Sequence, residues 1–207
     1  QAASAGCNSV AVTVKDASGH VYFDSTLPAA SGAVQTESTT AAALTAMTAS
    51  DTYTIARLSC LLDPIAAKAD VEGMGLKNTG GYIFYDGNNL NWLDPSKPAA
   101  RQYLCGLAKE LAEMGFDEIL LTDVSYPTEG KLDKIAYGET GKVQNLNAFL
   151  DEMRAALAEY DVKLSIELPA AAISEGSDSQ AGLTLTEIAP RVDRIYAATT
   201  EDQVSAL

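Results

Sequence analysis

The chain has 207 residues, of which 47% are hydrophobic and 20% charged, and its 28 acidic and 14 basic side chains give a net charge of −14. This is the composition of an ordinary globular protein, and the length allows one domain with a substantial core. An acidic surface repels nucleic acid and anionic lipid, and no stretch approaches the ~20 apolar residues of a membrane-spanning helix. We therefore expect neither a nucleic-acid partner nor insertion into a membrane.

The first half of the chain alternates extended and helical patterns. Residues 9–14 form a β-branched run typical of a buried strand, and the polar residues 16–24 predict a small hairpin. A short helix is predicted over residues 36–47, and a second strand over residues 52–60. Residues 63–95 then form a long loop with turn signals and four aromatic side chains, and loops of this length are usually functional.

The second half contains the clearest helices. Apolar residues recur at helical spacing over residues 95–116 and again over residues 145–160. The remaining predicted elements are strands over residues 117–124, 162–169 and 193–200 and a short helix or turn over residues 183–192.

Strands that alternate with helices indicate βαβ units and a parallel sheet. We count five strands and find no composition shift that would mark a second domain. The predicted fold class is α/β, a parallel (β/α) TIM-barrel-like domain over residues 1–207 that is incomplete or cropped in this chain. The length agrees, because a full eight-stranded barrel typically needs about 250 residues.

Signatures of metal and cofactor sites are missing from the sequence. The three cysteines are widely spaced and form no C-x-x-C or Cys/His pattern, and no glycine-rich nucleotide motif occurs. We therefore expect no metal and no cofactor, and we interpret Cys7, Cys60 and Cys105 as buried free thiols. His20 is the only histidine and lies in a turn, which argues against a Ser-His-Asp or Cys-His mechanism.

Polar side chains follow the predicted strands at the ends where a parallel barrel carries its site. Aromatic rings stack on the apolar faces of sugars and carboxylates accept hydrogen bonds from their hydroxyls, so this combination favours a carbohydrate ligand. The candidates from the strand ends and the long loop are Lys15, Asp16, Arg57, Trp92, Asp94, Asp123, Tyr126 and Glu167.

Five stretches taken together resemble a bacterial family of glycosyl hydrolase domains. They are KDASGHVYFDS, YTIARLSCLLDP, LNWLDP, ELAEMGFDEILLTDVSYPTEGK and VKLSIELP. The resemblance runs in order from about residue 6 to residue 197. It implies a barrel distantly related to the α-amylase type.

The same resemblance implies one strand before Val10 and further strands after Tyr196. We therefore expect missing chain segments or a partner to complete the barrel. The opening stretch QAASAGCNSV is typical of the end of a helix. We therefore expect that an upstream segment, such as a secretion signal, has been removed. The expected location is extracellular or in the cell envelope.

The sequence departs from the family pattern at two acids. The family's aspartate on the third strand is Thr122 here, and an acid on its first strand is Thr13, whereas the acid of the fourth strand is retained as Glu167. The resemblance implies a nucleophile at the position of Thr122 and a general acid at Glu167. Asp123, one residue further, would point to the opposite face of a regular strand unless a bulge or the start of the loop turned it.

Two main functions stay open at this point. The first is a glycoside hydrolase in which Glu167 is the general acid and Asp123 or Asp16 its partner, with Lys15, Arg57, Trp92, Asp94 and Tyr126 contacting the substrate. The alternative is a non-catalytic domain that binds a glycan or a cell-envelope component, and a scaffold without a small ligand is the third.

Two candidates also have simpler interpretations. Arg57 could pair with Glu167 or Asp16, and Trp92 could pack in the core. A second carboxylate that faces the same cleft as Glu167 would favour hydrolysis.

Overall fold

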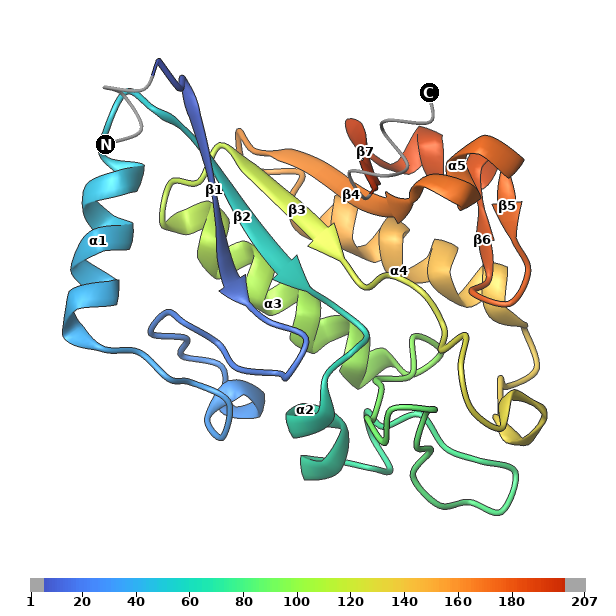
Figure 1. The fold of residues 1–207 in the computed structure, drawn as a ribbon. Helices are drawn as coiled ribbons and strands as arrows, with labels where there is room; N and C mark the ends of the chain where they lie inside the picture. Colours follow the sequence, from blue (N-terminus) through green and yellow to red (C-terminus); the bar gives the residue numbers. More distant parts are fainter. Residues whose placement is uncertain (1–5, 200–207) are drawn as a thin grey trace.

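Five strands form a single parallel sheet, as the sequence predicted. A computed structural model describes residues 6–199, and the strands lie in the order β1-β2-β3-β4-β7. Their bounds are β1 Ser9–Lys15, β2 Tyr53–Ser59, β3 Glu118–Thr122, β4 Lys163–Pro169 and β7 Arg194–Ala198. Each strand of this sheet pairs with the next strand of the same sheet along the chain, and all pairs are parallel. Their carboxyl ends therefore meet along one rim (Figure 1).

Two long helices cover one face of this sheet. α3 (Pro98–Glu113) and α4 (Lys142–Ala156) lie side by side behind it, and both pair an apolar face with a polar one (Figure 1). Alternate strand residues point to that face and are buried there: Ala56, Leu58, Ile119, Leu121, Leu164 and Ile166. α3 gives way to β3 through Gly115, whose φ of 90° is a conformation that glycine adopts without strain. α1 (Ser38–Thr48) lies outside this pair, in the connection between β1 and β2.

The other face of the sheet carries polar side chains, some buried and some partly exposed. Its side chains include Arg57, Glu118, Ser165, Glu167 and Arg194, which come from three neighbouring strands and the edge strand β7. Within residues 6–199, β1 and β7 each pair on one side only, so the sheet does not close on itself. The fold is therefore α/β and TIM-barrel-like but incomplete, as predicted.

The predicted long loop at residues 63–95 contains regular structure. It begins with helix α2 (Pro64–Ala69), which the sequence analysis missed. Proline occupies the first turn of this helix, and the Asp63 carboxylate accepts a hydrogen bond from the backbone N–H of Ala66 at 2.9 Å, as an N-cap residue does. Isolated antiparallel bridges, such as the one between Leu62 and Trp92, hold the rest of the loop against the body.

Small elements complete the carboxyl-terminal third and the loops. The predicted hairpin after β1 is confirmed by an antiparallel bridge between Lys15 and Val21. The other short elements are η2 (Pro28–Ala30), η3 (Leu132–Lys134), α5 (Ala170–Glu175), β5 (Ser177–Asp178), β6 (Leu183–Thr184), α6 (Leu185–Ile188) and η4 (Ala189–Arg191). β5 and β6 form a two-stranded antiparallel hairpin that the sequence analysis missed.

The cysteines are free, but only two of them are buried. Burial raises the pKa of the Cys60 and Cys105 thiols, that of Cys105 to about 12, so both stay protonated at neutral pH. The prediction was wrong for Cys7, which is exposed and lies just before β1. No helix among residues 6–199 is both long and apolar enough to cross a bilayer.

Candidate active site

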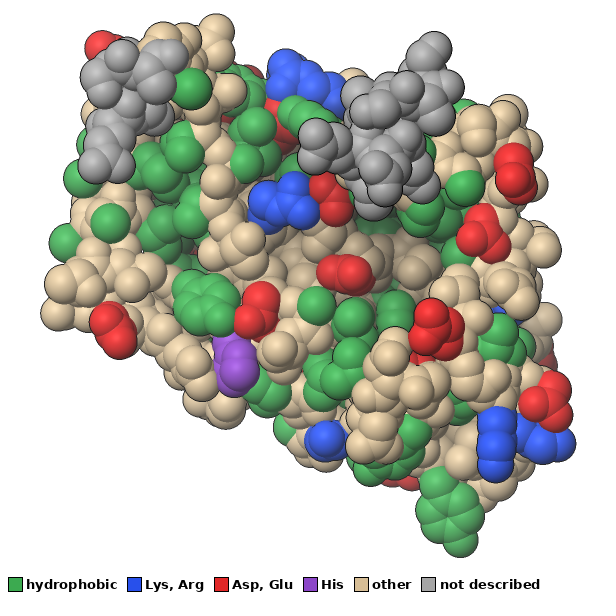
Figure 2. Space-filling model, viewed as in Figure 1, with side chains coloured by type: hydrophobic (Ala, Val, Ile, Leu, Met, Phe, Trp, Pro, Cys, Tyr) green, Lys and Arg blue, Asp and Glu red, His purple; other side chains and the backbone are tan. Residues whose placement is uncertain are grey.

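Two adjoining hollows open at the rim where the parallel strands end. The first has a volume of about 160 Å³ and lies at the ends of β3, β4 and β7; its lining is Asp123, Val124, Ser125, Glu167, Leu168, Pro169, Leu183 and Ala198. The second has a volume of about 200 Å³ and lies at the ends of β1, β2 and β3; its lining is Thr13, Lys15, Asp16, Ala17, Arg57, Ser59, Thr122 and Asp123. Figure 2 shows acidic and basic side chains near the middle of this face of the molecule.

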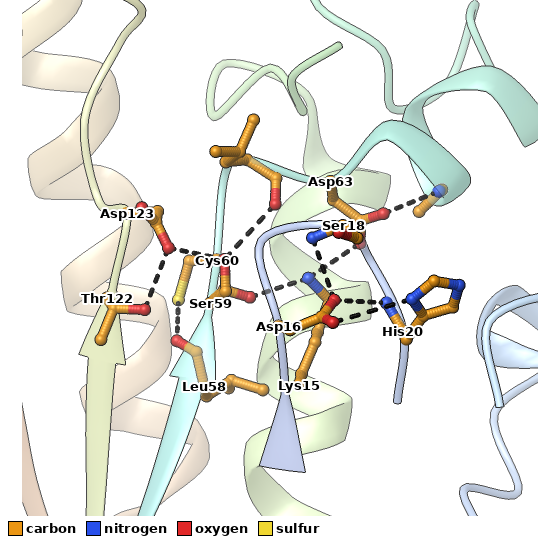
Figure 3. Close-up of polar contacts among 12 residues, drawn as sticks. Lys15, Asp16, Ser18, His20, Leu58, Ser59, Cys60, Asp63, Thr122 and Asp123 are labelled. Carbon is orange, nitrogen blue, oxygen red and sulfur yellow. Dashed lines mark hydrogen bonds and ion pairs between the residues drawn. The ribbon is translucent and has the colours of Figure 1, made fainter. Parts of the chain in front are cut away.

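Asp123 belongs to both hollows because the backbone turns sharply there. β3 ends at Thr122, and Asp123 has a φ of 54°, in the left-handed region that aspartate tolerates better than most residues. Its Oδ2 accepts hydrogen bonds from Ser59 Oγ at 2.7 Å and from Thr122 Oγ1 at 3.0 Å (Figure 3). Within residues 6–199, Oδ1 has no hydrogen-bond partner, so this oxygen is available to a ligand.

Glu167 forms a two-pronged ion pair with Arg57. Arg57 Nη1 and Nη2 donate to the two carboxylate oxygens at 2.9 and 3.1 Å, across 110 residues of sequence. The Glu167 side chain is 24% exposed and the Arg57 side chain 35%, so the pair is open to solvent. Two parallel hydrogen bonds fix the orientation of both groups. Of the two pairings that the sequence left open for Arg57, the structure has the one with Glu167.

Lys15 is fully buried beneath the second hollow. Its Nζ lies 3.0 Å from Asp63 Oδ2 and donates to the Ser59 carbonyl at 2.8 Å (Figure 3). Neither side chain of the Lys15–Asp63 pair is exposed to solvent. The ammonium group is therefore engaged with the protein, which favours a structural role over contact with a substrate.

Asp16 organises the hairpin that follows β1. Its carboxylate accepts hydrogen bonds from the backbone N–H groups of Ser18 at 2.9 Å and His20 at 3.0 Å (Figure 3). It also accepts one from Tyr22 Oη at 2.7 Å. Partial burial raises the pKa of Asp16, but the hydrogen bonds from Tyr22, His20 and Ser18 outweigh burial and leave the pKa below its ordinary value. Asp16 thus lines the second hollow as an ionised group.

Three predicted contacts lie in the interior and line neither hollow. Trp92 is 9% exposed and donates from Nε1 to Asp86 Oδ2 at 2.9 Å. Tyr126 is buried, and its hydroxyl accepts a hydrogen bond from Asn145 Nδ2 at 2.9 Å. Asp94 is also buried and accepts from the backbone N–H and Oγ of Ser96. These positions favour packing and turn formation over contact with a ligand.

Sequence reasoning missed several residues of the hollows. Ser59 was detectable, because it follows Arg57 by two positions and so shares its face at the end of β2. Leu183 and Ala198 had no signal, since they come from the small hairpin and the last strand and reach the hollow only through the fold. Among residues 6–199, no group of three or more His, Cys, Asp or Glu side chains is arranged to hold a metal ion.

Comparison with known proteins places the chain in a family. Residues 2–198 match the family described as "Putative glycosyl hydrolase domain". The chain belongs to this family. A solved structure of a hypothetical protein from Ruminiclostridium thermocellum shares 30% sequence identity with a TM-score of 0.69, over 80% of this chain and 85% of that one. No curated protein matches the chain.

Two more distant structures carry descriptions that mention a hydrolase or a sugar. The glycoside hydrolase domain of PelA from Pseudomonas aeruginosa is 17% identical with a TM-score of 0.44, over 81% of this chain and 62% of that one. Ega3 from Aspergillus fumigatus, in complex with galactosamine, is 12% identical with a TM-score of 0.45, over 92% of this chain and 66% of that one. The chain therefore spans about two thirds or less of both.

Proposed function

We propose that this glycosyl hydrolase-family domain binds a carbohydrate across the rim and cleaves a glycosidic bond there, with Asp123 and Glu167 as the two carboxylates. The left-handed turn at Asp123 carries this proposal. It brings a carboxylate with a free oxygen into the hollow that Glu167 also lines. Glycoside hydrolysis generally needs two carboxyl groups that flank the scissile bond.

Asp123 is a better partner for Glu167 than Asp16. Asp16 lines only the second hollow, and three hydrogen bonds commit it to the hairpin. Asp123 shares a hollow with Glu167, and its two bonds both fall on Oδ2. Oδ1 of Asp123 is thus the atom that would attack the sugar or activate a water molecule.

Glu167 would protonate the departing sugar oxygen. A proton on either of its oxygens weakens the hydrogen bond that this oxygen accepts from Arg57, because a protonated carboxyl oxygen is a poorer acceptor than a carboxylate oxygen. We therefore expect Arg57 to release one contact when a sugar occupies the cleft. The solvent-exposed position of the pair makes such a rearrangement inexpensive.

A second candidate, binding without cleavage, is favoured by one specific observation. Threonines occupy the two strand positions where the family resemblance implies acids, and Thr122 donates a hydrogen bond to Asp123 instead of acting as an acid itself. A cleft of this kind could hold a glycan through Asp123, Arg57 and Glu167 and leave it intact.

A hydrolysis and glycan-array screen on the whole chain separates these candidates. We expect Asp123→Asn and Glu167→Gln each to lower turnover by about 10²–10⁴-fold, the usual worth of a positioned acid or base. Asp51→Asn and Glu159→Gln are matched controls, because both are exposed surface acids. Glycan capture with no turnover would establish binding alone, and the absence of both would overturn each candidate.

A further inference from the structure

Asp123 is the one residue shared by the linings of the two hollows. Arg57 lines the second hollow and Glu167 the first, and their ion pair joins the two. The candidate catalytic carboxylates therefore lie at the boundary between two spaces and not at the bottom of one. Each space has a volume of the same order, about 160 and 200 Å³.

The two hollows differ in the residues that line them. Five apolar residues line the first, namely Val124, Leu168, Pro169, Leu183 and Ala198. Most residues that line the second carry a hydroxyl or a charge; among them Thr13 is exposed and Asp16 is ionised. Both linings combine apolar and polar surface, which suits the C–H faces and the hydroxyl groups of sugar rings.

The charges around the two hollows disfavour an acidic ligand. The carboxylates are Asp16, Asp123 and Glu167, and the cations are Arg57 and Lys15. Both cations are already paired, Arg57 with Glu167 and Lys15 with the buried Asp63, which adds a further negative charge. A carboxylate on the ligand would therefore meet unbalanced negative charge.

We propose that the site takes a glycan of at least two sugar units without carboxylates, one unit in each hollow, with the linkage over Asp123. This inference rests on the proposed carbohydrate function and specifies the length and charge of its ligand. A single sugar unit occupies one hollow and leaves the contacts of the other unused. Affinity then rises from one unit to two and changes less with further units.

Calorimetric titration of the whole chain tests this dependence on length. The probes are glucose, galactose and N-acetylglucosamine, their linear oligomers of two to six units, and oligogalacturonates of the same lengths. We expect at least about a tenfold rise in affinity from one to two units in the series that binds, and weaker binding of the oligogalacturonates.

A variant pair locates the second unit. Thr13→Trp places a ring in the second hollow, and Ala11→Trp is the matched control, since Ala11 is exposed two residues earlier on the same face of β1. Thr13→Trp should remove the gain from the second unit and leave binding of the single sugar unchanged, while Ala11→Trp should change neither.

The outcomes distinguish failure of this inference from failure of the proposed carbohydrate function. Equal affinity for one and two units in the unmodified chain, or preferred binding of oligogalacturonate, overturns the inference while carbohydrate binding stands. Failure of every sugar to bind overturns both. The length series uses the unmodified chain, so a Thr13→Trp protein that does not fold leaves the test intact.

Discussion

Two carboxylate–arginine pairs lie on the same face of the sheet, at opposite ends. At the amino-terminal end, Glu118 is fully buried and bonds to Tyr53 Oη at 2.8 Å, Ser165 Oγ at 2.5 Å and the Arg194 guanidinium. At the carboxyl-terminal end, Glu167 is 24% exposed and Arg57 is its hydrogen-bond partner. Both arginines are partly exposed, so the difference lies in the carboxylates: Glu118 is fully buried with three side-chain partners, whereas Glu167 is partly open to water.

This difference distinguishes a structural pair from the pair that we propose to be functional. A buried carboxylate must have all its polar partners, because leaving it unpaired is costly. We therefore interpret Glu118 as a structural residue of the protein interior. A partly exposed carboxylate can exchange protein contacts for water or a ligand at little cost, which is what a binding or catalytic group requires.

The largest expected effect concerns Lys15. It tests whether burial decides if a charged residue is structural, or whether its position at one end of the sheet does. Lys15 lies at the same rim as Glu167, yet its pair with Asp63 is completely buried. Lys15→Met should leave Asp63 without a counter-charge and lower the free energy of unfolding by about 3–5 kcal/mol. Urea denaturation measures this change, with Lys131→Met at an exposed position as the control.

A stable Lys15→Met protein that has lost ligand binding would contradict this view. Lys15 would then be a contact for the substrate, as the sequence analysis expected, and burial would be a poor guide to function at this rim.

The next effect compares the two arginines directly. Arg194→Ala leaves the buried Glu118 carboxylate without its cation, so we expect a larger loss in the free energy of unfolding than for Arg57→Ala. Arg57→Ala leaves Glu167 accessible to water, so the loss should be about 1 kcal/mol or less. Parallel urea titrations of the two variants give the difference, and equal losses would remove the distinction between the two ends.

The smallest effect concerns pH and the hairpin carboxylate Asp16. Its pKa lies below the ordinary 3.8, so its stabilising contribution is present above about pH 4 and is lost as the pH falls through the lowered value. Tyr22→Phe removes one of the hydrogen bonds that lower this pKa. We expect the variant to be less stable than the unmodified chain by up to about 1 kcal/mol near neutral pH.

That difference should shrink as the pH falls below about 4, where Asp16 becomes protonated in both proteins. Thermal or urea unfolding between pH 2.5 and 7 measures it. A difference that stays constant over this range would mean that Tyr22 acts through packing and not through the charge of Asp16.

The strands and long helices were largely predictable, whereas the site was predictable only in part. Glu167 and Asp123 were recognised because they stand at the ends of apolar strands. Trp92 and Tyr126 were assigned to the ligand because a loop aromatic in sequence gives no sign of the side on which the fold will bury it. Both are held inside by partners that are distant from any strand end, Asp86 and Asn145.

The sequence by itself determined the order of the five sheet strands and the two long helices, because hydrophobic periodicity is a local property that each segment carries alone. It also determined which end of the sheet would collect the polar groups, since parallel strands align their carboxyl ends. Only the tertiary structure decided the direction of the Asp123 carboxylate, because one backbone torsion at the end of β3 sets it. The pairing of Arg57 with Glu167 was likewise decided by packing, since those residues meet only when β2, β3 and β4 assemble.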